Sequence, residues 1–237
     1  MLLKIYDNNP DVRAVRRAAA TLRDGGIIIY PTDTIYAIGC DIFQARAVEK
    51  ICRIKGIRPA KANLSFICQD LSHISEYARI SNSVFKLMKR NTPGPFTFIL
   101  NGSSRLPKLF RQKNTVGIRV PDNAIVRALV EELGNPLMTA SLKDYEGWAL
   151  AEESESSKRR RDRDWPDDDD SDLPSEFNED DTPVEYSTDP ELIEERYGHL
   201  VDLVIDGGMG RIEPSTVVDC TGDEPLIVRQ GTGELVW

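Results

Sequence analysis

Hydrophobic and polar residues follow two different periods along the chain. Residues 11–23 place apolar side chains at helical spacing, begin after Pro10 with an acid in the expected first turn, and end at Gly25-Gly26, so they predict a helix. Residues 26–30 form a short β-branched run that Pro31 ends, which predicts a buried strand. The two patterns alternate to the end of the chain and predict an α/β fold.

The same patterns predict the remaining elements. Helices are expected at residues 45–55, 83–90, 123–133 and 189–197, with Asn123 as the cap of the third. Strands are expected at residues 64–68, 97–100, 116–120, 137–140, 203–205, 216–218 and 226–228. No internal repeat is visible, so these elements are expected to share one core.

The charge of the chain is concentrated in one segment. The 237 residues are 40% apolar and 29% charged, which is typical of a globular domain, and the net charge is −9. Residues 152–183 contain 14 acidic and 5 basic residues, which leaves 25 acidic and 25 basic residues elsewhere. A neutral remainder argues against nucleic-acid binding through bulk charge, so nucleotide binding would need a local site.

The acidic segment also breaks the alternation of helices and strands. Residues 152–183 offer almost nothing apolar to bury and are expected to form a disordered insert. A tolerated surface insertion is the simpler interpretation, since long loops cost little closure entropy, and a regulatory or docking segment is the alternative.

The cysteines and the hydropathy of the chain indicate in which cellular compartment the protein is expected. The four cysteines form no C-x-x-C pair, so the sequence contains neither a zinc motif nor a redox motif, and buried thiols are expected. No apolar run approaches the roughly 20 residues of a membrane span, and no secretory segment opens the chain. A cytoplasmic protein without a membrane partner is therefore expected.

Familiar catalytic motifs are missing from the sequence. It contains no phosphate-binding P-loop, no G-x-G-x-x-G after the first strand, no G-x-S-x-G and no H-E-x-x-H. The two histidines, His73 and His199, lie beside no candidate nucleophile and are expected to be surface or capping residues. Triad chemistry is therefore not indicated.

Polar residues instead interrupt apolar sequence where the predicted strands and helices end. They are Thr32-Asp33-Thr34, Lys55, Arg58, Arg119, Ser141, Ser215 and Arg229. In an open α/β sheet the carboxyl ends of strands line the ligand crevice, so these side chains are expected to converge there. Two simpler roles stay open: Arg119 could pair with a carboxylate at the edge of the core, and Ser215 could be a cap.

Several ordered motifs then resemble a known family. They are residues 26–40 (GIIIYPTDTIYAIGC), 55–59 (KGIRP), 92–97 (TPGPFT), 116–121 (VGIRVP), 206–208 (DGG) and 214–219 (PSTVVD). Together they resemble the YrdC-type threonylcarbamoyl-AMP synthase family over nearly the whole chain except the acidic insert. The resemblance implies a single α/β domain over residues 1–237, interrupted at about 152–183. It also implies a twisted mixed sheet with flanking helices and a large concave groove.

The resemblance also implies a reaction. The family joins L-threonine, bicarbonate and ATP into threonylcarbamoyl-AMP and pyrophosphate, usually with Mg²⁺, and the product serves the threonylcarbamoyladenosine modification of tRNA. The attacking carbamate is already an anion, so no side-chain base is needed. The site must instead position the reactants and place positive charge against phosphate oxygens.

The family motifs assign roles to individual residues. Lys55 and Arg58 would be catalytic and contact the nucleotide. The guanidinium of Arg119 would fork onto the threonine carboxylate, with Thr32 and Thr139 beside it. The remaining nucleotide contacts would come from Thr97, Ser141, Ser215 and Arg229. No metal ligand is expected among the protein side chains.

Four positions depart from the family pattern. Lys55-Gly56-Ile57-Arg58 is one residue longer than the family's Lys-x-Arg, Ser141-Leu142-Lys143 replaces Ser-x-Asn, Lys61 stands near the usual Asn, and Ile67 stands at a usual His. These differences resemble the YciO-like branch. The alternative function is therefore a relative that binds nucleotide or double-stranded RNA in the same groove, with weak or different activity.

Overall fold

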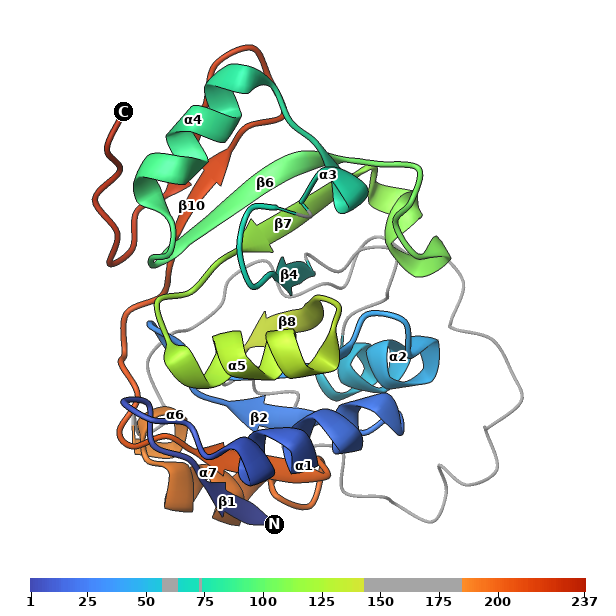
Figure 1. The fold of residues 1–237 in the computed structure, drawn as a ribbon, viewed down its shortest axis with the longest axis vertical. Coiled ribbons are helices and arrows are strands. Elements are labelled where there is room, and N and C mark those ends of the chain that lie inside the picture. The colour runs from blue at the N-terminus through green and yellow to red at the C-terminus, as the bar shows by residue number, and fades with distance from the viewer. Residues whose placement is uncertain (57–63, 73, 143–184) are drawn as a thin grey trace, which may run out of the picture.

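A computed structural model describes residues 1–56, 64–72, 74–142 and 185–237 (Figure 1). Arg58, Lys61, His73, Lys143 and the predicted acidic insert at 152–183 lie outside the described residues. No helix among the described ranges is long and apolar enough to cross a membrane.

The described strands form one mixed sheet in the order β1-β9-β2-β3-β8-β4-β7-β6-β10-β11, with β5 paired to β6. Their bounds are β1 Leu2–Lys4, β2 Ile28–Tyr30, β3 Ala37–Asp41, β4 Ser65–Ile67, β5 Ala78–Arg79, β6 Phe96–Gly102, β7 Thr115–Arg119, β8 Leu137–Ser141, β9 Leu203–Asp206, β10 Thr216–Asp219 and β11 Leu226–Arg229. The pairs β1/β9, β2/β9, β4/β7 and β6/β10 are parallel. The pairs β2/β3, β3/β8, β4/β8, β5/β6, β6/β7 and β10/β11 are antiparallel, which confirms the mixed sheet.

Helices flank this sheet. Their bounds are α1 Val12–Arg23, α2 Ala45–Ile54, α3 Ile74–Tyr77, α4 Asn82–Asn91, α5 Ala124–Leu133, α6 Glu185–Thr188 and α7 Pro190–Tyr197, with a 3₁₀ helix η1 at Lys108–Lys113. Side-chain caps fix the starts: Asp11 accepts from the Ala14 amide at 2.8 Å, and Asn123 accepts from the Val126 amide at 3.0 Å. Asp11 therefore precedes the first turn of α1 instead of lying within it.

Two cores form on the two faces of the sheet. The larger core joins alternate strand residues such as Ile38, Phe66 and Phe98 to apolar residues of α2, α4 and α7. The second core joins Tyr30, Ile67 and neighbouring strand residues to α1 and α5, which lie side by side in front of β2 and β8 in Figure 1. Because successive strand residues point to opposite faces, one strand supplies both cores.

Every helix and strand predicted from the sequence is present, with ends shifted by at most two residues. The prediction missed β1, β3, β5, α3, α6 and η1. Strand β3 was missed because Gly39 interrupts its apolar run, and glycine is unfavourable in strands. The structure needs glycine there, because a Cβ at Gly39 would meet the Met138 carbonyl and the Tyr30 hydroxyl.

Candidate functional site

A strip of polar residues crosses one face of the central strands. Thr139 in β8 lies opposite Ser65 in β4, and Ser65 lies opposite Gly117 in β7. Gly117 pairs with Ile99 in β6, so Thr97, two residues earlier, points to the same face. We call Thr139, Ser65, Gly117, Thr97 and the adjacent Ser215 the polar strip. The α1 and α5 core lies on this same face, over Tyr30 and Ile67.

Gly117 is the position in the polar strip that has no side chain. A Cβ at this position would meet the Ser65 side chain and, at 3.3 Å, the Thr97 methyl group. The Ser65 and Thr97 side chains therefore approach each other over the bare Gly117 backbone. A glycine in the middle of a strand often marks such a close approach.

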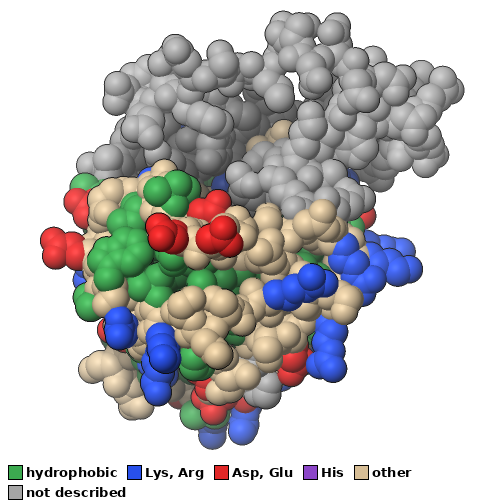
Figure 2. All heavy atoms as spheres, turned by 90° about the horizontal axis from the view of Figure 1, so that it is seen from above, with side chains coloured by type: hydrophobic (Ala, Val, Ile, Leu, Met, Phe, Trp, Pro, Cys, Tyr) green, Lys and Arg blue, Asp and Glu red, His purple; other side chains and the backbone are tan. Residues whose placement is uncertain are grey.

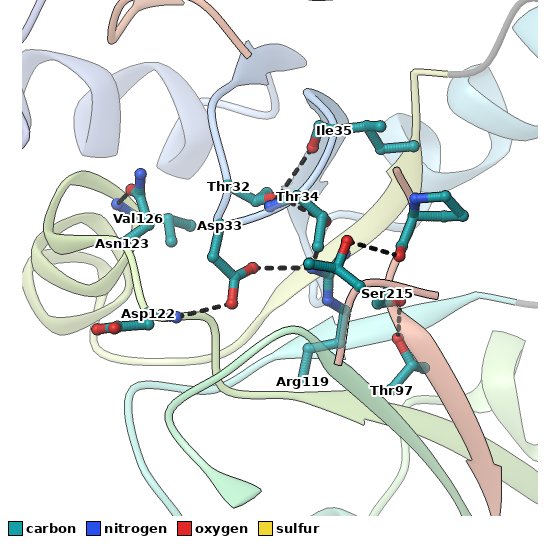
Figure 3. Close-up of polar contacts among 12 residues, drawn as sticks. Thr32, Asp33, Thr34, Ile35, Thr97, Arg119, Asp122, Asn123, Val126 and Ser215 are labelled. Carbon is teal, nitrogen blue, oxygen red and sulfur yellow. Dashed lines mark hydrogen bonds and ion pairs between the residues drawn. The ribbon is translucent and has the colours of Figure 1, made fainter. Parts of the chain in front are cut away.

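One end of the polar strip brings three predicted nucleotide-binding residues together. The Thr97 and Ser215 hydroxyl oxygens are 2.9 Å apart, and both side chains are buried (Figure 3). Arg229 Nη2 donates to the Ser215 carbonyl at 2.8 Å and lies 3.5 Å from its hydroxyl. Two hydroxyls and one guanidinium from three separate chain segments thus form one polar cluster, and its contact with a nucleotide stays a prediction.

A second cluster surrounds Arg119, whose side chain is only 8% exposed. Its Nη2 donates to Asp33 Oδ1 at 3.2 Å and to Thr34 Oγ1 at 3.0 Å (Figure 3). Its Nε is buried without a hydrogen-bond partner among the described residues. Sequence reasoning offered an ion pair and a carboxylate site as alternative roles for Arg119. The structure contains the ion pair, and the contact of Arg119 with a carboxylate ligand stays a prediction.

Thr32 holds the loop after β2. Its hydroxyl accepts from the Thr34 amide at 3.0 Å, donates to the Ile35 carbonyl at 2.8 Å and lies 3.0 Å from the Thr34 hydroxyl. A hydroxyl offers one donor and two acceptor sites, so these contacts use its whole capacity. Thr32 therefore places Thr34 against Arg119. The direct contact of Thr32 with threonine stays a prediction.

Asp33 and Thr34 were noted in the sequence with Thr32 but were given no role, and in the structure both contact Arg119. Asp33 also accepts from the Asp122 amide at 3.0 Å, so its carboxylate ties the loop after β2 to the segment before α5 (Figure 3). Burial raises the pKa of Asp33, and the nearby Arg119 charge opposes that rise. The available signal was the polar triplet Thr32-Asp33-Thr34 directly after a buried strand, of which only Thr32 was given a role.

Thr139 is held by a tyrosine at the other end of the polar strip. The Tyr30 hydroxyl donates to Thr139 Oγ1 at 2.7 Å, and both residues are buried. Burial raises the pKa of Tyr30, so its proton stays in place at neutral pH. Because the Thr139 hydroxyl accepts this bond, its own proton is not used by it, and its contact with threonine stays a prediction.

Lys55 reaches strand β8 from the end of α2. Its Nζ donates to the Ser141 carbonyl at 2.6 Å, and Ser141 is the last residue of β8. Burial lowers the pKa of Lys55 to about 8. The structure thus brings the predicted pair Lys55 and Ser141 together, but through the Ser141 backbone. Arg58, the other predicted catalytic residue, lies outside the described residues.

The residues of the site do not converge at the carboxyl ends of the strands, which corrects the sequence-based expectation. Arg119 and Ser141 end their strands, but Thr97 is the second residue of β6, and Ser215 directly precedes β10. The rule holds for parallel sheets, whose strands all end at one edge. Here antiparallel neighbours end at opposite edges, so the shared surface is a face of the sheet.

A pocket of about 360 Å³ adjoins the loop after β2. Its lining includes Thr32, Asp33, Asp122, Asn123 and Arg211. Of the predicted site residues that the structure describes, Thr32 is the one that lines it. The large concave groove implied by the family resemblance stays a prediction.

The predictions for the cysteines and for His199 agree with the structure. All four cysteines are free and buried, and burial raises the pKa of each thiol. His199 is exposed. Within the described ranges, no three His, Cys, Asp or Glu side chains gather as a metal site.

Comparison with known proteins agrees with this fold. The family model Sua5_yciO_yrdC, described as telomere recombination, matches residues 20–163 and 177–231. The uncharacterized protein YciO of Escherichia coli K12 is 39% identical over 234 residues, covering 98% of this chain and 95% of that protein. The threonylcarbamoyl-AMP synthase of Halorhodospira halophila is 33% identical over 129 residues, covering 54% of this chain and 67% of that protein.

Solved structures show the same architecture. The crystal structure of E. coli YciO superimposes with a TM-score of 0.77 at 38% identity, covering 99% of this chain and 97% of that one. P. abyssi Sua5 in complex with L-threonine superimposes with a TM-score of 0.72 at 21% identity, covering 98% of this chain and 57% of that one. The chain therefore belongs to the Sua5/YciO/YrdC family and has its mixed α/β fold.

Proposed function

We propose that this chain makes threonylcarbamoyl-AMP from L-threonine, bicarbonate and ATP. The observation that carries the proposal is the state of Arg119. Asp33 and Thr34 hold Nη2, while the buried Nε has no partner among the described residues. An unpaired buried N–H is costly, and a carboxylate is the acceptor that a guanidinium binds best. Arg119 is thus a fitting receptor for the carboxylate of an amino acid.

The other end of the polar strip suits the nucleotide. There Thr97 and Ser215 offer hydroxyls and Arg229 offers a guanidinium, while the partly buried amine of Lys55 lies at the β8 end, beside Ser141. In the proposed step, an oxygen of the threonine-derived carbamate forms a bond to the α-phosphorus. The bond from the α-phosphorus to the bridging oxygen of the β-phosphate breaks, and pyrophosphate leaves with that electron pair. The positive groups would stabilise the charge that develops on the phosphate oxygens.

The proposal includes Mg²⁺ bound to the phosphates of ATP. The described residues provide no cage of acidic or histidine ligands for it. Mg²⁺ commonly keeps several waters and binds through substrate phosphates, so the expectation that protein side chains supply no metal ligand is compatible with its use.

The second candidate function is a relative that binds a nucleotide or double-stranded RNA in the same site and acts weakly or on another amine. The observation that favours it is Ile67, which stands where the family resemblance places a histidine. Ile67 pairs with Leu137 and is fully buried in the core beneath α1 and α5. An apolar residue there removes one polar group from the amino-acid end of the site while the nucleotide end keeps its cluster.

The test incubates the protein with ATP, Mg²⁺, L-threonine and bicarbonate, and measures pyrophosphate release and the mass of the product. Release that requires both threonine and bicarbonate supports the synthase. Saturable ATP binding without release supports the second function and contradicts the first. The variant Arg119→Lys keeps the charge but loses the fork, so it is expected to abolish release and leave ATP affinity unchanged. Arg90→Lys, an exposed change on α4, is the matched control.

A further inference from the structure

A second polar region lies at the far ends of the strands that carry Thr97 and Gly117. Residues 77–121 contain nine Lys or Arg residues and no Asp or Glu. They build β5, α4, β6, η1 and β7, at the upper part of Figure 1. Figure 2 views this part from above and shows several Lys and Arg side chains at the right, others at the left beside a hydrophobic area, and some Asp and Glu side chains on the same face. The neutral charge balance outside the acidic segment therefore conceals a strongly basic lobe.

In the basic lobe, residues 77–121, few of the described positive charges are paired with acidic side chains. Arg119 pairs with Asp33, but Arg79, Arg105, Lys108 and Arg111 form no ion pair with any acidic residue that the structure describes. Clustered cations without acidic partners repel one another and attract anions. The four side chains are exposed, so a ligand can reach them.

A pocket of about 170 Å³ lies within this cluster. Its polar lining consists of Arg79, Ser103, Ser104, Arg111 and Asn114, and no acidic residue in the described part of the chain lines it. One water molecule occupies roughly 30 Å³ in the liquid, so the pocket is large enough for a small polyatomic anion. The two arginines and the Ser104 hydroxyl around this hollow are donors that suit a tetrahedral oxyanion, whereas the Ser103 hydroxyl already donates to the Glu76 carbonyl.

The pocket is built by the fold. Arg111 Nε donates to the Leu106 carbonyl at 2.6 Å, which holds the guanidinium beside the hollow. The Ser103 amide donates to the Tyr77 carbonyl at 2.9 Å, and the Gly102 amide donates to the Asn114 carbonyl at 2.7 Å. These contacts join both ends of the connection between β6 and β7, so the donors are placed before a ligand arrives.

We propose that this pocket binds a phosphate group, supplied either by a free phosphate anion or by the backbone of a polynucleotide. It is separate from the polar strip, because Gly102 follows Thr97 by five residues of β6, or roughly 17 Å of strand. The proposal therefore does not depend on the synthase reaction. The basic surface ends on one side at the acidic residues Asp223 and Glu224, which lie in the turn between β10 and β11. This turn lies beside β6, because the Asn101 side chain donates to the Thr221 carbonyl at 3.2 Å.

The test compares two double variants with equal charge change. Arg79→Gln/Arg111→Gln removes both pocket cations, and Lys86→Gln/Lys89→Gln removes two exposed cations of α4 in the same lobe. Binding of inorganic phosphate is measured by NMR titration, and binding of a short fluorescent RNA by anisotropy at several salt concentrations. Circular dichroism and thermal melting establish that each variant is folded. The single variant Arg79→Gln, which leaves the Arg111 contact intact, replaces the double variant if that one unfolds.

The expected result is a loss of affinity of roughly 10-fold or more in the pocket variant and little change in the α4 variant, because hydrogen bonds to charged groups contribute strongly. If inorganic phosphate shows this loss, the source is a free anion. If RNA shows it, with a salt slope lowered by about 1 for each removed contact, the source is a polynucleotide. The proposal is overturned if neither probe binds, or if both variants bind either probe equally well.

Discussion

Arg119 Nη2 lies 3.2 Å from Asp33 Oδ1, and this buried ion pair joins residues 86 positions apart in the chain. Asp33 accepts in addition from the Asp122 amide, so one carboxylate holds both the guanidinium and the segment that leads to α5. The pair fixes the orientation of Arg119 and leaves its Nε unsatisfied. The Nη2 group of the guanidinium is thus committed to the fold, and the proposed role of the rest of the guanidinium in ligand binding stays a prediction.

Replacement of Asp33 by Asn is expected to remove a pH dependence of stability. Burial raises the folded-state pKa of Asp33 above its unfolded value, so the folded state binds more protons between these two pKa values. The contribution of this group to the free energy of unfolding therefore falls as pH rises from about 4 through the raised pKa. Urea unfolding of wild type and Asp33→Asn across that range should show the difference.

Asp24→Asn is the matched control for that experiment, because it removes an exposed carboxylate at the end of α1. Identical pH profiles for wild type and Asp33→Asn would contradict the assignment to Asp33.

A methyl group at Gly117 is expected to destabilise the sheet by about 1–3 kcal/mol, the usual cost of overpacking. The added Cβ would meet the Ser65 side chain and lie 3.3 Å from the Thr97 methyl. Combining Gly117→Ala with Ser65→Ala should restore part of the loss, since it removes the Ser65 hydroxyl from the contact. Chemical denaturation of the two single variants and the double variant measures this coupling, and additive effects would refute it.

The affinity for ATP is expected to fall as pH rises from 7 to 9. Burial lowers the pKa of Lys55 to about 8, so the amine loses its charge in this interval and its attraction for phosphate with it. The full effect would be roughly 10-fold, as for a hydrogen bond to a charged group. Lys55→Arg keeps its charge throughout and should show a flat profile in calorimetric titrations. A decline of equal steepness in both proteins would assign the effect to another group.

Removal of the Ser215 hydroxyl is expected to weaken ATP binding by roughly 3- to 10-fold, the range for one hydrogen bond. Ser215 and Thr97 lie 2.9 Å apart, so Thr97→Val should produce a similar loss, and the double variant should cost less than the sum of the two. Ser83→Ala on the exposed start of α4 is the control. Unchanged ATP affinity in Ser215→Ala would exclude this cluster from the nucleotide site.

The sequence by itself determined the local elements and the family motifs. The helix at residues 11–23 was predicted because Pro10, an acid at its start and Gly25-Gly26 bound apolar side chains at helical spacing, and all of these signals lie within one short window. Strand β2 was predicted in the same way, from its β-branched run before Pro31. The motif residues Thr32, Arg119 and Ser215 were recognisable for the same reason.

Only the tertiary structure decided which of these residues meet. Thr97 and Ser215 are 118 positions apart, and they meet because β10 adds in parallel to β6. Asp33 acquired its role because β7 ends beside the loop after β2, which no local pattern records. The polar strip depends on the register of five strands, and a shift by one residue would turn each side chain to the other face. Long-range strand pairing in the mixed sheet therefore determined which side chains meet, while local propensity determined which helices and strands form.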